Sequence, residues 1–256
     1  MYDPSLLDAL SLREWAVLAM AAGCVGFAKT AIGGIGMVAV ALFAVVLPAR
    51  ESTGALLPLL IAGDVVAVTA YRRHASRRTV LALLPGVVPG LFLGALFLAA
   101  VGDATLRLVL ASTLLVLTGW QLVLRLRGGP TVVTPGRASG PATVTAGVGA
   151  GFATMTANAA GPVMTLYLVM AGLPKLQMLG TGAWFFLVVN LLKLPFSASL
   201  HLIEPASLAL DLALLPPMLL GAGAGRVVVR RLHQQQFEIA ALGLAALSAA
   251  LLLATS

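Results

Sequence analysis

Charged residues are scarce in this chain: Asp, Glu, Lys and Arg make up 10% of its 256 residues, against about 25% in a typical soluble domain. Apolar residues make up 60%, and the mean hydropathy is +1.02. Uncharged runs of 22 residues (Val80 to Val101) and 37 residues (Ala138 to Pro174) match or exceed the roughly 20 residues that cross a bilayer. These features exclude an ordinary soluble domain and predict an all-α integral membrane protein.

The side chains that usually build catalytic or metal sites are also few. A single cysteine, Cys24, excludes an internal disulfide. The histidines His74, His201 and His233 fall at predicted loop ends without metal-ligand spacing, so no metal and no cofactor are predicted. No nucleophile stands beside a base, only Asp64 is an acidic residue at depth, and no phosphate-binding loop is present. The sequence therefore predicts no enzyme and no ATP-driven mechanism in this chain.

The net charge of +7 does not indicate a nucleic-acid partner. The arginines stand in tight groups at the ends of apolar runs, as membrane-flanking charges do, and no basic face is interleaved with aromatics. Met1 to Leu12 contains two aspartates and no basic n-region. A cleaved signal peptide is therefore not expected, and the first apolar segment is expected to direct insertion.

Two polar, glycine-rich breaks interrupt the apolar sequence. The first runs from Gly26 to Gly36, and a similar stretch runs from Gly151 to Pro162. The arms beside the first break, Trp15 to Ala28 and Gly36 to Leu47, have 14 and 12 residues, about 21 and 18 Å of helix and short of the roughly 30 Å hydrocarbon core. A re-entrant or broken helix pair is predicted. Because irregular backbone in a membrane must be satisfied by protein or water, the two breaks are predicted to share one cavity.

Three crossing helices are predicted after the first broken pair, at Thr53 to Tyr71, Val80 to Val101 and Ala104 to Leu124. Arginines gather in the loop from Arg72 to Arg78 and again from Arg125 to Arg137. The positive-inside rule places both segments in the cytoplasm, as two crossings between them require.

The pattern then repeats beyond a polar, Pro- and Gly-rich linker. We predict a first membrane repeat at 1–127, a cytoplasmic linker at 128–141 and a second membrane repeat at 142–256. Ser52-Thr53-Gly54 recurs as Gly180-Thr181-Gly182. Leu83-Leu84-Pro85, followed by Gly90 and Gly94, recurs as Leu214-Leu215-Pro216, followed by Gly221 and Gly225. Several recurrences in the same order indicate a duplication.

The arginine bias inverts between the two halves. The segment Ser199 to Pro205, which corresponds to the four-arginine loop, has no Lys or Arg, whereas the Gly102-Asp103 turn corresponds to Arg230-Arg231-Leu232-His233. The sequence therefore predicts two inverted-topology repeats, each a re-entrant or broken helix pair plus three transmembrane helices. That arrangement is typical of secondary transporters with a site at the repeat interface. Both termini are then expected outside the cytoplasm, and no oligomeric state is indicated.

The chain resembles the TauE/SafE family of bacterial sulfite and organosulfonate exporters from Trp15 to Leu253. The resemblance rests on the duplicated break, on the elements Pro48 to Gly54 and Pro174 to Gly182, and on Tyr71-Arg72-Arg73. It implies export of a small oxyanion, sulfite or a short organosulfonate, across the cytoplasmic (inner) membrane of a bacterium. A passive anion channel, an importer of a related sulfur oxyanion and a lipid-handling protein remain as alternatives.

An oxyanion needs several hydrogen-bond donors and positive potential, which a broken helix and a nearby cation supply. Asp64 is interpreted as a counter-charge or proton carrier. Lys29 is the expected cation, although it could pair structurally with Asp64 or extend to an interface, and Lys193 could reach water. Thr53 and Thr181 could be plain N-caps. The predicted substrate-binding residues are Lys29, Thr30, Gly33, Gly34, Gly36, Thr53, Thr154, Asn158, Gly161, Thr181, Asn190 and Lys193.

Overall fold

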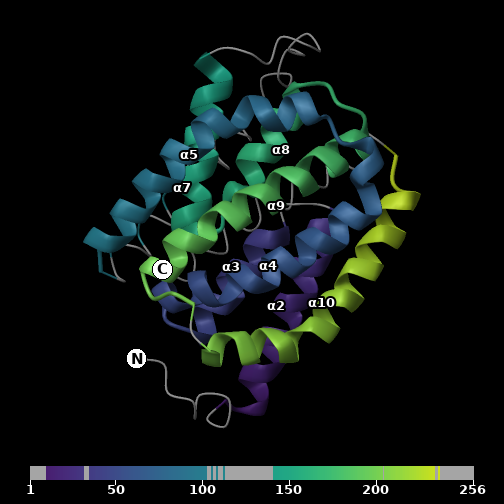
Figure 1. The fold of residues 1–256 in the computed structure, drawn as a ribbon. Helices are drawn as coiled ribbons and strands as arrows, with labels where there is room; N and C mark the ends of the chain where they lie inside the picture. The colour runs from purple at the N-terminus through teal and green to yellow at the C-terminus, as the bar shows by residue number, and fades with distance from the viewer. Residues whose placement is uncertain are drawn as a thin grey trace.

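The computed structural model describes residues 10–31, 35–102, 141–203 and 205–233, with the isolated positions 105, 108, 112 and 236. Every regular element in this part of the chain is a helix, which confirms the all-α prediction (Figure 1). The elements are α2 (Leu12–Thr30), α3 (Gly36–Val46), α4 (Ala49–Tyr71), the short 3-10 helix η2 (Arg72–His74), α5 (Arg77–Ala100), α7 (Pro141–Ala157), α8 (Ala160–Met170), α9 (Lys175–Ser199) and α10 (Pro205–Arg231).

Four of the described helices are long and apolar enough to cross a membrane: Glu51–His74, Arg77–Ala100, Lys175–Ser199 and Ser207–Arg231. They make the chain a multi-pass membrane protein. The predicted crossing from Ala104 to Leu124, almost all of the predicted linker and the last crossing predicted for the second half lie outside the described residues.

Both predicted breaks are present as interruptions between helices. The first separates α2, which ends at Thr30, from α3, which begins at Gly36. The second separates α7 from α8 at Asn158, whose backbone is in the left-handed region with φ of 51°. Asn is one of the few residues that adopt this conformation readily. Its N–H donates to the carbonyl oxygen of Thr154 at 3.0 Å, which closes α7.

Three sequence-based expectations about helix ends are wrong. The first arm is not 14 residues long, because α2 has 19, about 28 Å of helix. It begins earlier because Ser11 and Glu14 form a capping box: Ser11 N–H donates to Glu14 Oε2 at 2.8 Å, and Glu14 N–H donates to Ser11 Oγ. Thr53 and Thr181 are not N-caps, since α4 and α9 begin after Pro48 and Pro174 respectively.

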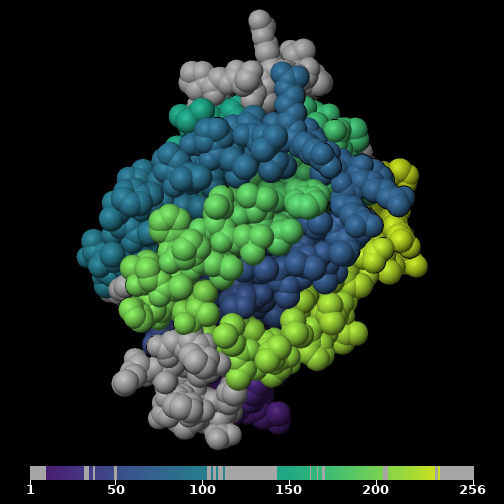
Figure 2. Space-filling view, in the orientation of Figure 1, coloured from purple at the N-terminus to yellow at the C-terminus, as the bar shows by residue number. Residues whose placement is uncertain are grey.

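One face of the molecule carries four long helices in the order α5, α9, α4, α10, each in contact with the next. Figure 2 shows them as neighbouring bands. Helix α7 packs on α5, at one side of this layer, and α2 packs on α10, at the other. In the chain, α5 follows α4 and α10 follows α9. The layer therefore has the same arrangement when it is read from either side.

Glycines let the backbones of α5 and α7 come into direct contact. A Cβ atom built on Gly90 would lie 2.3 Å from the carbonyl oxygen of Val148, and one on Gly151 would lie 2.4 Å from that of Val87. Side chains larger than hydrogen are therefore excluded at both positions. Close packing on small residues is the usual way in which membrane helices associate.

The pair α2 and α10 makes the same contact with the corresponding residues. A Cβ on Gly221 would lie 2.0 Å from the carbonyl oxygen of Gly23, and one on Gly26 would lie 1.8 Å from that of Met218. Gly221 is the residue that the sequence matched to Gly90. The two helix pairs therefore pack through equivalent glycines, one pair on each side of the molecule.

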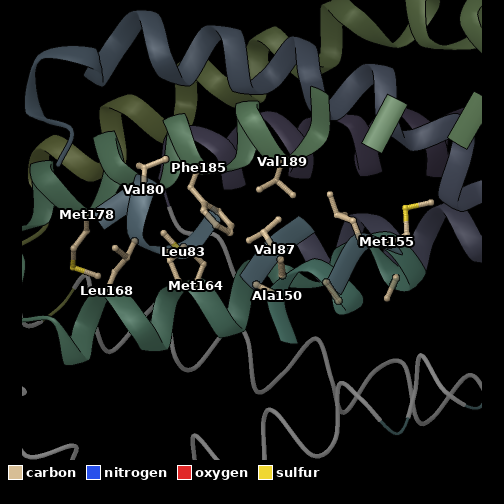
Figure 3. Packing of buried hydrophobic residues seen from close by; sticks show 14 of the residues in the cluster. Val80, Leu83, Val87, Ala150, Met155, Met164, Leu168, Met178, Phe185 and Val189 are labelled. Atoms are coloured by element: carbon tan, nitrogen blue, oxygen red, sulfur yellow. The ribbon is translucent and has the colours of Figure 1, made fainter. Parts of the chain in front are cut away.

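Buried apolar residues form two large clusters. Figure 3 shows the first cluster. In it, Leu83 and Val87 of α5, Met164 of α8 and Phe185 of α9 pack with residues of α7. The second joins α2, α3, α4 and α10, with Phe43 fully buried at its centre.

The described arginines of the loop after α4 and of the end of α10 lie at one end of the helix layer. The backbone N–H of Ser76 donates to Thr181 Oγ1 at 2.9 Å, which attaches the loop to the start of α9. Lys175 at that start donates to the carbonyl oxygen of Leu232 at 2.6 Å, which attaches the end of α10. At the other end, the start of α4 at Gly54 touches Leu202 after α9. Helices α4 and α9 are thus antiparallel.

Candidate functional site

A cavity opens where the two apolar clusters meet, between the two breaks. With its mouth it holds about 930 Å³ of empty space. Its walls come from α2, α3, α4, α7, α8 and α9 and are mostly apolar or glycine. Its polar lining residues are Lys29, Asp64, Thr154, Asn158, Thr165 and Asn190. A mostly apolar cavity with a few convergent polar groups is the usual form of a small-molecule site.

An ion pair joins α2 to α4 at the cavity wall. Lys29 Nζ, near the end of α2, lies 2.7 Å from Asp64 Oδ1. The Lys29 side chain is 11% exposed and that of Asp64 is completely buried. Asn190 Nδ2 donates to the other carboxylate oxygen, Oδ2, at 2.6 Å. The Phe186 ring centroid lies 4.7 Å from Lys29 Nζ, which adds a cation–π contact. Asp64 therefore has one partner on each oxygen.

The second buried lysine holds the second break. Lys193, which is 1% exposed, donates from Nζ to the carbonyl oxygen of Thr154 at 2.7 Å and to Asn158 Oδ1 at 2.5 Å. Thr154 belongs to the last turn of α7, where the helix dipole favours a cation. Asn158 Nδ2 donates in turn to the carbonyl oxygen of Thr53 at 3.0 Å. One chain of hydrogen bonds thus connects α9, the break and α4.

Positive charge exceeds negative charge around the cavity. Lys29 at the wall and Lys193 behind it carry two positive charges when both are protonated, and Asp64 carries one negative charge when ionised. The acceptors of Lys193 that the structure gives are neutral oxygens. Charges at this depth are costly in a membrane, and they usually mark a substrate or ion pathway. The local excess suits an anion.

Two helix N-termini lie at the wall of the same cavity. Gly36 opens α3 and Gly161 is the second residue of α8, and both line the cavity. The N-cap of α3, Ile35, makes no side-chain capping bond. The first N–H groups of a helix have no partner within it and, with the helix dipole, attract anions.

The structure brings about half of the predicted site residues together. Gly33 and Gly34 lie outside the described residues. Thr30, Thr53, Thr181 and Lys193 are buried but do not line the cavity. The cavity wall contains Lys29, Gly36, Asp64, Thr154, Asn158, Gly161 and Asn190.

Buried hydroxyl groups away from the cavity hold helices together. Thr30 Oγ1 donates to the carbonyl oxygen of Ala222 at 2.8 Å, which attaches α2 to α10, and the Thr30 carbonyl accepts from Tyr71 Oη at 2.7 Å. Thr181 Oγ1 accepts from the backbone of Ser76.

Phe186 and Thr165 are among the residues of the cavity wall that the sequence interpretation missed. Phe186 stands four residues before Asn190, on the same face of α9, and Thr165 stands four residues after Gly161 on α8. The i, i+4 spacing within a helix was the signal that could have found both.

These features define a class: a multi-pass α-helical membrane protein with a cavity at two helix interruptions, lined by a lysine–aspartate ion pair. Residues 18–252 match the family model described as sulfite exporter TauE/SafE, so the chain belongs to that family. The family expected from the duplicated break is therefore confirmed. Searches of curated proteins and of solved structures found no match.

Proposed function

We propose that this chain is a secondary transporter that exports a small oxyanion, sulfite or a short organosulfonate, across the cytoplasmic membrane of a bacterium. One observation carries the proposal: Lys29 and Asp64 line the cavity where both helix interruptions meet, and a second buried lysine, Lys193, bonds to the second interruption. Membership of the sulfite exporter family supplies the class of activity.

Lys29 is the residue expected to contact the anion. Its side chain is 11% exposed and lines the cavity, as do Gly36 at the start of α3 and Gly161 in the first turn of α8. Charge-assisted hydrogen bonds from an ammonium and from helix N–H groups are the strong ones in oxyanion recognition. Asn158, Asn190 and Thr165 stand in the same wall and add neutral donors.

Equivalent packing supports two inverted repeats that move about the cavity by alternating access. Gly90 meets Val148 as Gly221 meets Gly23. If α5 is exchanged with α10 and α4 with α9, the helix order α5, α9, α4, α10 becomes the same order read from the other side. We assign residues 1–127 and 142–256 to the two repeats. Transporters of this kind place the site at the repeat interface, where discontinuous helices meet.

The arginine distribution supports an orientation. The arginines at 72, 73, 77 and 78 are exposed at the same end of the helix layer as Arg230 and Arg231. By the positive-inside rule this end faces the cytoplasm. The start of α2 and the Gly54–Leu202 contact then face outward, and both termini are placed outside.

Transport by purified protein in liposomes tests the proposal. Vesicles are loaded with labelled sulfite, sulfoacetate, methanesulfonate, sulfate or thiosulfate, and release is compared with that from protein-free vesicles. We expect at least one sulfur oxyanion to leave with saturable kinetics and to exchange with the same unlabelled anion outside. Saturation and exchange distinguish a carrier from a passive channel. Failure of every anion to move would overturn the proposal.

A matched pair of lysine variants assigns the flux to the cavity. Lys29→Ala removes the exposed ammonium and should abolish release. Lys175→Ala is the control, because Lys175 lies at the start of α9 and bonds to carbonyl oxygens at the end of α10, outside the cavity. Equal release by the two variants would contradict a site at Lys29.

A further inference from the structure

We infer that Asp64 binds a proton whenever an anion occupies the cavity, so that the two are carried together in the same direction. This inference rests on the proposed anion transport and adds a second transported ion to it. It follows because the ammonium group of Lys29 would have to bind both the carboxylate of Asp64 and the anion.

Anion and carboxylate compete for Lys29. In the structure, Lys29 Nζ lies 2.7 Å from Asp64 Oδ1, and no other donor among the described residues reaches that oxygen. An anion bound at Lys29 draws the ammonium away from Asp64. A fully buried carboxylate that loses its charge partner is strongly destabilised, and protonation relieves this cost.

The hydrogen bonds of Asp64 allow a proton on Oδ1 alone. Oδ2 accepts from Asn190 at 2.6 Å whether or not the carboxyl group is protonated. Oδ1 loses only the ion pair with Lys29 when it becomes an O–H group. Asp64 lines the cavity but is fully buried beside Lys29, so movement of Lys29 toward an anion would open it to water there. The neutral acid thus keeps one bond and frees Lys29 for the anion.

The groups around Asp64 leave it as the acceptor of this proton in the described part of the chain. Lys29 faces it from α2, and Asn190 and Lys193 face it from α9. Helix α3 carries no titratable side chain. Asp211 on α10 is buried, and neither of its carboxylate oxygens has a hydrogen-bond partner.

The charge balance favours movement of both the empty and the loaded site. In the empty site, the charges of the two lysines, both protonated, and of ionised Asp64 sum to +1. With a monovalent anion and a proton on Asp64, the same groups again sum to +1. Because the cost of a buried charge depends on its magnitude, neither form is penalised relative to the other during reorientation. By linkage, the proton strengthens anion binding by the same factor by which the anion strengthens proton binding.

Calorimetry on the purified protein measures the coupling. Methanesulfonate and sulfate, which stay ionised between pH 6 and 8, are titrated in buffers of different ionisation enthalpy. We expect uptake of about one proton per anion, with Kd rising by up to about tenfold per pH unit where Asp64 ionises. Asp64→Asn, which mimics the neutral acid, should bind the anion without proton uptake and with a Kd independent of pH.

Flux with a pH-sensitive dye inside the vesicles completes the test. The wild-type protein should move protons with the anion. Asp64→Asn should move no protons with whatever anion it still exchanges, whereas Asp211→Asn, at a buried carboxylate that does not line the cavity, should move both. Anion transport by wild type without proton movement or uptake, or proton movement in Asp64→Asn, would refute this inference and leave the proposed transport intact. Absence of any anion flux would refute both.

Discussion

Lys193 donates a 2.5 Å hydrogen bond to the side-chain oxygen of Asn158, so a lysine in the second half of α9 holds the residue at which α7 and α8 separate. The bond fixes an interrupted backbone at a buried position, where it would otherwise need water or another partner. This role explains why Lys193 is buried although its two acceptors are neutral oxygens. The second break is thus stabilised by a cation from a neighbouring helix.

Substitution of Asn158 should separate its backbone role from its side-chain role. Asn158→Gly keeps the left-handed conformation and removes the bonds to Lys193 and Thr53. Asn158→Ala removes the same bonds and adds the cost of positive φ, about 1–2 kcal/mol. We expect both variants to lower thermal stability in detergent, and Asn158→Ala to lower it further. Equal stability of the two variants would contradict the backbone assignment.

The glycine contact between α2 and α10 should not tolerate a methyl group. Gly221→Ala places a Cβ 2.0 Å from the carbonyl oxygen of Gly23, and overpacking of this kind costs about 1–3 kcal/mol or more. Gly223→Ala, two residues along the same helix, meets nothing within 4 Å. We expect the first variant to unfold at a clearly lower temperature and the second to resemble wild type.

The equivalent contact on the other side of the molecule gives an independent check. Gly90→Ala, whose Cβ would meet the carbonyl oxygen of Val148 at 2.3 Å, should behave like Gly221→Ala. A well-tolerated Gly90→Ala beside a damaging Gly221→Ala would argue against equivalent packing in the two halves.

Crowding of the Lys29 side chain should reduce transport without removing a charge. A Cβ on Gly63 would lie 3.0 Å from Lys29 Cγ, so Gly63→Ala shifts the lysine side chain by a few tenths of an ångström beside Asp64. We expect slower anion release and a raised KM in liposomes. Gly149→Ala is the control, because its Cβ meets nothing within 4 Å. Unchanged kinetics in Gly63→Ala would show that the position of Lys29 does not govern binding.

The proposed orientation can be tested with cysteines at three exposed positions. In a Cys24→Ser background, His74→Cys and His233→Cys should react with a membrane-impermeant maleimide only after the cells are permeabilised. Ser199→Cys, at the other end of α9, should react in intact cells. Labelling of positions 74 and 199 from the same side would contradict the orientation.

Much of the helix pattern could be predicted because it depends on local sequence. The length of an uncharged run limits a membrane helix, and α4 and α5 begin and end within a few residues of the bounds predicted for the first two crossings. The breaks were evident because Gly, Asn and Pro interrupt apolar runs. The start of α2 was missed because the capping box of Ser11 and Glu14 extends the helix into a charged segment.

The pairing of site residues could not be predicted because it depends on packing between distant helices. Lys29 was expected at the site, but the choice between a free cation and a partner of Asp64 stayed open. The bond between Lys193 and Asn158 depends on the left-handed turn at the second break. Thr30 was predicted to bind substrate, yet its hydroxyl group bonds to α10.

The most direct test of the central claim is the position of a bound oxyanion. A crystal structure with selenite, a heavier analogue of sulfite, gives an anomalous signal at selenium. We expect a selenium peak in the cavity, between the first turns of α3 and α8, with a selenite oxygen about 3 Å from Lys29 Nζ. Lys29→Ala should show no such peak. Selenite found only at the arginine-rich end, at a concentration that competes with transport, would contradict the account.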